Sequence, residues 1–92
     1  MSVNIEVLGP EPACVRCRAT LQRAFDAAAK LSDTGIVANV EKRDINADEI
    51  IDRYGIVGSP AVVINGRVVT SGRIPAVQEI VQAASAAAGA KA

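Results

Sequence analysis

The two cysteines of the chain, Cys14 and Cys17, lie in one Cys-x-x-Cys tetrapeptide where the hydrophobic period of the sequence changes. Before it, apolar and polar residues alternate over residues 3–8, which predicts a β-strand. After it, apolar residues recur every three or four positions as far as Leu31, which predicts an amphipathic helix. A thiol at a helix start is biased toward the thiolate, and a partner one turn later can close a local disulfide. This junction therefore constrains both the fold and the chemistry.

The rest of the chain continues the alternation of strands and helices. The first helix is expected over residues 14–31, followed by a second strand over 36–41, whose alternation places Lys42 on the same side as Val40. Asn46 followed by Glu49 has the spacing of a capping box and predicts a short second helix. The predicted buried stripe of the first helix comprises Cys17, Leu21, Ala24, Phe25, Ala28 and Leu31.

The last third of the sequence predicts a hairpin and a final helix. Asn65-Gly66 stands between two apolar runs, which is typical of a hairpin turn. Pro75 suits the first turn of a helix, and the alanine-rich residues 86–92 are expected to fray. The predicted order is β-α-β-α-β-β-α in one domain over residues 1–92. Its first two strands should be parallel, because a helix connects them, and the hairpin should add antiparallel strands.

Composition narrows the classes of function. Ten basic and ten acidic residues cancel, and the only aromatic residues are Phe25 and Tyr54, so nothing predicts binding to nucleic acid or to an acidic membrane. The sequence shows no secretion signal and no run long enough to cross a bilayer. We therefore expect a cytoplasmic location. A Cys-x-x-Cys pair there indicates redox or metal chemistry and not a structural disulfide.

Several segments, in this order and spacing, resemble the small thioredoxin-like, or redox-active disulfide, proteins of archaea and bacteria. The resemblance extends over residues 3–84 and implies the minimal thioredoxin/glutaredoxin-like fold, an α/β fold with a four-stranded mixed sheet and helices on both faces. The segments that carry it are Ile5–Pro10, the Cys14 and Cys17 pair, Tyr54–Ala61, Ile64–Gly66 and Ser71–Arg73.

The resemblance also implies roles for residues beyond the dithiol. Pro60 is expected to follow a cis peptide bond and to face the cysteines, in a loop that pairs with the backbone of bound substrate. Ser59 and Gly72 are assigned to the same substrate-binding surface. Lys42 is directed toward the region behind the dithiol, where an amine could assist proton transfer, although a lysine at a strand end is more often solvated.

The residues themselves suggest how the two thiols divide the work. Cys14, at the helix start, is the expected nucleophile toward a substrate disulfide, and Cys17, on the inward stripe, is expected to resolve the mixed disulfide. Arg16 could add positive potential around Cys14. The alternative interpretation is that Arg16 is an ordinary solvated side chain on the helix surface. The acid and the tryptophan that larger thioredoxins carry near the dithiol are replaced here by Leu8 and Ala13.

The expected activity is that of a thioredoxin-like protein disulfide reductase without a cofactor or bound metal. Its expected partners are disulfide-containing substrate proteins and a thioredoxin-reductase-type electron donor, and we expect a monomer. Three alternatives stay open. The chain could carry a soft metal ion through Cys14 and Cys17, although its lack of histidine does not favour zinc. It could be a glutathione-dependent enzyme of the glutaredoxin type, or a non-catalytic interaction module.

Overall fold

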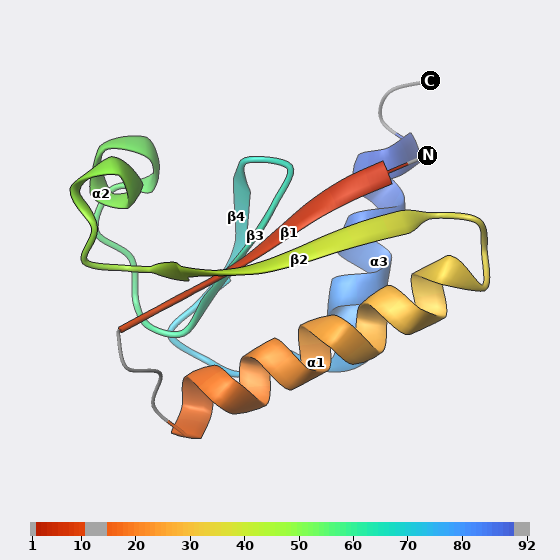
Figure 1. The fold of residues 1–92 in the computed structure, drawn as a ribbon, viewed down its shortest axis with the longest axis horizontal. Coiled ribbons are helices and arrows are strands. Elements are labelled where there is room, and N and C mark those ends of the chain that lie inside the picture. Colours follow the sequence, from red (N-terminus) through yellow and green to blue (C-terminus); the bar gives the residue numbers. More distant parts are fainter. Residues whose placement is uncertain (1, 11–14, 90–92) are drawn as a thin grey trace.

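The computed structural model describes residues 2–10 and 15–89 of the chain. Seven elements follow one another in the order that the sequence predicts, as Figure 1 shows. In chain order they are β1 (Ser2–Gly9), α1 (Val15–Ser32), β2 (Val37–Asp44), α2 (Asp48–Tyr54), β3 (Ala61–Ile64), β4 (Arg67–Ser71) and α3 (Val77–Gly89).

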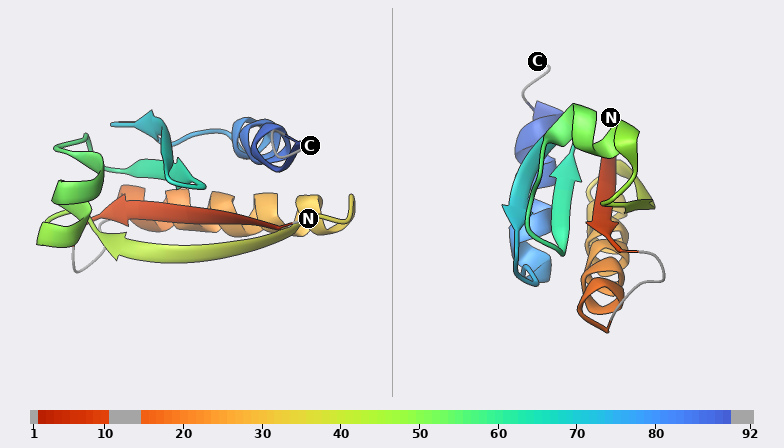
Figure 2. Two further views of the ribbon diagram at one scale, coloured as in Figure 1. Left: turned by 90° about the horizontal axis from the view of Figure 1, so that it is seen from above. Right: turned by 90° about the vertical axis from the view of Figure 1, so that its left-hand side faces the viewer.

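The strands form one mixed sheet with the order β2-β1-β3-β4. β1 and β2 are parallel and joined through α1, whereas β3 is antiparallel to both of its neighbours. α1 and α3 pack on one face of the sheet, and α2 covers the opposite face near one end (Figures 1 and 2). The predicted four-stranded mixed sheet with helices on both faces is confirmed.

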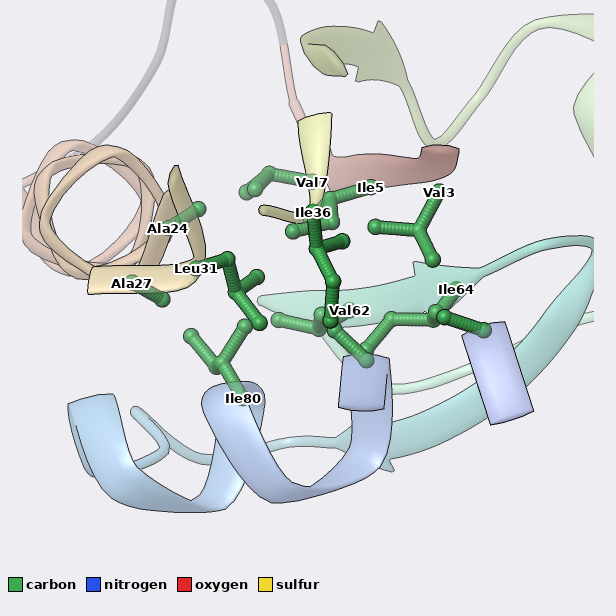
Figure 3. Packing of buried hydrophobic residues seen from close by; sticks show 12 residues of the cluster. Val3, Ile5, Val7, Ala24, Ala27, Leu31, Ile36, Val62, Ile64 and Ile80 are labelled. Carbon is green, nitrogen blue, oxygen red and sulfur yellow. The ribbon is translucent and has the colours of Figure 1, made fainter. Parts of the chain in front are cut away.

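The main hydrophobic core lies between the sheet and the pair α1 and α3 (Figure 3). Alternate residues of β1 point into it, which is why the strand reads as apolar and polar in turn. The two helices contribute several alanines, so they can approach the sheet closely. The buried members are Val3, Ile5, Val7, Ala24, Ala27, Leu31, Ile36, Val62, Ile64, Ile80, Ala84 and Ala88.

The buried stripe of α1 differs most from the prediction at Phe25, and the predicted Leu21 and Ala28 are only half-buried. Phe25 is 50% exposed, whereas Thr20 and Ala27 are buried. Positions 17, 20, 24, 27 and 31 follow alternating steps of three and four residues, and Phe25 lies about 100° around the helix from Ala24. Thr20 tolerates burial because its hydroxyl donates a hydrogen bond to the Arg16 carbonyl at 2.9 Å.

The predicted capping box at the start of the second helix is wrong. The residue that precedes α2 is Ala47, and no side chain caps the helix there. Asp44 explains the shift, because its carboxylate accepts a hydrogen bond from the Asn46 backbone N–H at 2.9 Å and forms a turn before the helix. β2 accordingly continues to Asp44, three residues beyond its predicted end.

The bounds of the last helix also differ from the prediction. Pro75 precedes α3, which begins at Val77, and the Glu79 carboxylate accepts a hydrogen bond from the Ala76 N–H at 3.0 Å. The helix includes residues 86–89, which were expected to fray, because Ala88 is 5% exposed and packs in the main core. The remaining part of the predicted frayed end, residues 90–92, lies outside the described residues.

Candidate functional site

Cys17 lies in the first turns of α1, on the helix side that faces the sheet. Its side chain is fully buried, as the sequence predicts for the inward cysteine. Cys14, the other half of the motif, falls outside the residues that the structure describes. The described part of the site is therefore built around the Cys17 sulfur.

The loop before β3 meets Cys17 from the other side of the chain. The Ser59–Pro60 peptide bond is cis, so this prediction is confirmed. The Ser59 hydroxyl lies 3.5 Å from the Cys17 Sγ. Pro60, the next residue in the chain, is buried. Two segments more than forty residues apart thus place the second cysteine of the motif against the loop of the cis proline. Their predicted role in binding substrate stays a prediction.

Gly9, the last residue of β1, lies directly beneath the Cys17 thiol. A Cβ atom added to Gly9 would be 2.5 Å from the Cys17 Sγ and 3.1 Å from its Cβ. Real side chains do not approach that closely, so only glycine lets the thiol pack over the strand end. Sequence reasoning gave Gly9 no role at the site, because a glycine before a proline also suits an ordinary turn.

Lys42 ties the ends of β1 and β2 together below the same thiol. The parallel register pairs it with Val7, whose side chain points into the main core, so the prediction of its side of the sheet is confirmed. The Lys42 Nζ donates to the carbonyls of Gly9 at 3.1 Å and Pro10 at 3.2 Å. The ammonium thereby fixes the segment on which the Cys17 thiol rests. A role in proton transfer stays a prediction.

Gly72, which follows β4, joins the site through its backbone. Its N–H donates to the carbonyls of Gly58 at 3.1 Å and Pro60 at 2.9 Å, which holds it against the cis-proline loop. Arg16, at the start of α1, donates a hydrogen bond from its Nη2 to the Gly72 carbonyl oxygen at 3.0 Å. Arg16 is exposed, as its solvated interpretation requires, but its guanidinium is also bound to this loop. The structure thus brings Arg16, Cys17, Ser59, Pro60 and Gly72 together.

An apolar groove of about 430 Å³ lies next to the cis-proline loop, and it was not anticipated from the sequence. Its most exposed apolar side chain is Ile56, which is 94% accessible. The signal for this groove in the sequence was an apolar residue, Ile56, in the loop before Pro60. Hydrophobic periodicity does not show whether an apolar loop residue is exposed. The groove is lined by Pro10, Ile45, Asn46, Ile51, Ile56, Val57 and Ser59.

A polar cluster around Glu6 lies on the α2 side of the sheet, away from Cys17. The Tyr54 hydroxyl donates to Glu6 Oε1 at 2.6 Å, and Arg43 Nε lies 3.3 Å from Glu6 Oε2. Burial raises the pKa of Tyr54, and the hydrogen bond to Glu6 raises it further. Leu8 is fully buried in the smaller apolar cluster on this side. Tyr54 therefore links the end of α2 to β1 through a side-chain hydrogen bond.

Two further observations apply to the described residues alone. None of their helices combines the length and apolar character needed to span a bilayer. They also contain no group of three or more His, Cys, Asp or Glu side chains that could hold a metal ion.

Comparison with known proteins supports the fold described above. The model of a family described as a thioredoxin domain matches residues 3–85. The solution structure of the oxidised thioredoxin from Plasmodium falciparum is similar, with a TM-score of 0.62 over 94% of this chain and 81% of that one. The two sequences are 16% identical, so this likeness concerns the fold. None of the curated proteins compared with the chain matches it.

Proposed function

The chain belongs to the thioredoxin-domain family, and on that premise we propose that it is a thiol–disulfide oxidoreductase that reduces disulfides in partner proteins. The observation that carries this proposal is the contact between Cys17 and the cis-proline loop. The second thiol of a Cys-x-x-Cys motif is buried, and it lies 3.5 Å from the hydroxyl of the residue before a cis proline. A shielded thiol in this position is suited to act second, after another thiol has met the substrate.

In the proposed cycle, the Cys14 thiolate attacks one sulfur of a substrate disulfide. A Cys14–substrate disulfide forms, and the other substrate sulfur leaves as a thiolate that takes up a proton. Cys17, after losing its proton, attacks the Cys14 sulfur and releases the second substrate thiolate. The substrate gains two electrons and two protons, and the protein is left with a Cys14–Cys17 disulfide.

The cycle needs a partner that returns two electrons to the protein. We propose a thioredoxin-reductase-type donor and a cytoplasmic setting, where dithiols are kept reduced. Arg16, Ser59, Pro60 and Gly72 would form the surface that receives the substrate segment. Their support is the set of contacts that unites them: Ser59 with Cys17, and Gly72 with both Pro60 and Arg16.

Insulin reduction with dithiothreitol as electron donor tests the assignment of the two thiols. We expect Cys14→Ser to lower the rate to that of dithiothreitol alone. Cys17→Ser should still attack and should accumulate a mixed disulfide that mass spectrometry detects. Ser85→Ala, a change at an exposed position of α3, is the control and should keep the full rate. Unaltered turnover by a folded Cys14→Ser variant would refute the proposal.

A further inference from the structure

Arg16 is an exposed cation at the rim of the candidate site. Its guanidinium is bound to the Gly72 carbonyl, 56 residues away along the chain. We propose that Arg16 selects disulfides that have an acidic residue next to the reacting cysteine. The proposal rests on the proposed function, because it concerns the substrate of the same site.

The first argument is that both backbone groups of Gly72 are already hydrogen-bonded. Its N–H is bound to Gly58 and Pro60, and its carbonyl already accepts the bond from Arg16. A substrate segment that paired with this carbonyl would compete with the guanidinium. An aspartate or glutamate on that segment could accept the displaced N–H together with a second guanidinium N–H, since a guanidinium and a carboxylate can form two parallel hydrogen bonds. A neutral or basic segment would offer no such replacement.

The second argument is the distribution of charge around the site. Among the described residues, Arg16 has no carboxylate partner and uses one of its five N–H donors. Other arginines are neutralised: Arg73 pairs with Glu79, and Arg43 with Glu6 and Glu41. The Arg16 charge therefore remains available to an incoming anion.

The carboxylates of α2 do not neutralise the Arg16 charge, because α2 and α1 lie on opposite faces of the sheet. Asp48, Glu49 and Asp52 belong to the helix on the opposite face of the sheet from α1 (Figure 1). An acidic substrate residue is thus attracted on the α1 side and repelled on the α2 side. Charge complementarity of this kind fixes the orientation of a partner and its rate of encounter.

Reduction of three cyclic disulfide peptides by the intact protein tests the proposal. The peptides differ at one position next to the cysteine, which is Glu, Gln or Lys. We expect kcat/KM to fall in that order, by about two- to five-fold between Glu and Gln in low salt, as for an exposed ion pair. The preference should shrink at 0.5 M NaCl, because salt screens exposed charges.

Variants separate a role in selection from a structural one. Arg16→Gln should remove the preference, so that the Glu and Gln peptides are reduced with equal kcat/KM, and Arg16→Glu should reverse the order. Arg18→Gln is the matched control, because Arg18 is exposed and lies roughly 200° around the helix from Arg16. It should keep the preference.

The outcomes distinguish this proposal from the one it rests on. If the wild-type protein reduces none of the peptides, the proposed function fails. If it reduces all three at equal rates, the function stands and the role of Arg16 is refuted. Equal slowing of all three peptides by Arg16→Gln would show that Arg16 only holds the loop. Loss of the preference in Arg18→Gln as well would show a general charge effect and would also refute the role of Arg16.

Discussion

The main core and the surroundings of the Cys17 thiol are assembled in different ways. Twelve buried residues share the main core, and all of them are aliphatic. Around the Cys17 thiol, three residues from separate segments meet: Gly9, Lys42 and Ser59. We call these three residues and Cys17 the thiol junction. Packing energy in the core is spread over many small contacts, whereas the junction depends on a few contacts at fixed places.

This difference implies that stability and chemistry can be changed separately. A substitution in the core should lower the free energy of unfolding and leave the reactivity of the folded molecules as it was. A substitution in the thiol junction should alter the reactivity of the thiol more than its effect on stability would suggest. The predictions that follow test this separation.

The largest effect is expected from Leu31→Ala, in the main core. Removing a fully buried leucine should lower the free energy of unfolding by about 2–5 kcal/mol, since it loses burial and leaves a cavity. Urea denaturation measures this loss, and Leu31→Met, which keeps the volume, should cost less than about 1.5 kcal/mol. Disulfide reduction per folded molecule should stay at the wild-type rate for both variants. A lower rate would show that the core and the junction are coupled.

Gly9→Ala is expected to have the next largest effect on stability. Its Cβ would lie 2.5 Å from the Cys17 Sγ, so the thiol or the strand end must move, at a cost of about 1–3 kcal/mol. The rate at which iodoacetamide modifies Cys17 should change as well, read by mass spectrometry in a Cys14→Ser background.

Gly89→Ala is the matched control for this glycine. It introduces the same methyl group at the end of α3, where, among the described residues, no atom outside the helix's own turn lies within 4 Å of the new Cβ. It should be neutral or slightly stabilising, since alanine favours a helix more than glycine does. If the two substitutions have the same small effect and Cys17 reacts as before, Gly9 has no special role beneath the thiol.

The core was predictable from the sequence to a greater degree than the junction. Alternation in residues 3–8 gave β1 its buried face, and spacing of three and four placed Leu31 inward. Such periods report which side chains share a face of one element. They do not report that Arg16 reaches Gly72 or that Gly9 lies under a thiol, because these contacts depend on how separate elements meet.

The wrong local predictions have a similar origin. The Asn46 and Glu49 spacing fits a capping box, but Asp44, two residues earlier, makes a turn that shifts the start of α2. Phe25 was placed inward for its apolar character, although a small residue beside it on the helix fits closer to the sheet. The cis Ser59–Pro60 bond was predicted correctly, and that prediction came from the family resemblance and not from periodicity.

The smallest effect is expected from an exposed ion pair that connects the loop after β4 with the start of α3. Both Arg73 terminal nitrogens contact Glu79, and Glu79 also accepts the Ala76 N–H at 3.0 Å. The Arg73 hydrogen bond is the main reason that the pKa of Glu79 falls from 4.5 to about 2, and the Ala76 bond adds to it. Because the pKa is lower in the folded state, the carboxylate stabilises the protein fully above about pH 4.5, and this contribution disappears as pH falls toward 2.

Thermal melts of the wild-type protein and Glu79→Gln from pH 7 to pH 2 check this sign. The variant should melt at a slightly lower temperature at pH 7, and the two curves should converge between about pH 4.5 and 2. Arg73→Gln should produce the same convergence, and the double variant should add little to either change, because both substitutions remove one interaction. Reduction of the neutral Gln peptide should change little in either variant, because the pair connects the loop after β4 with the start of α3 and does not touch the thiol junction. A constant gap in melting temperature down to pH 2 would instead assign the effect of Glu79 to packing and not to its charge.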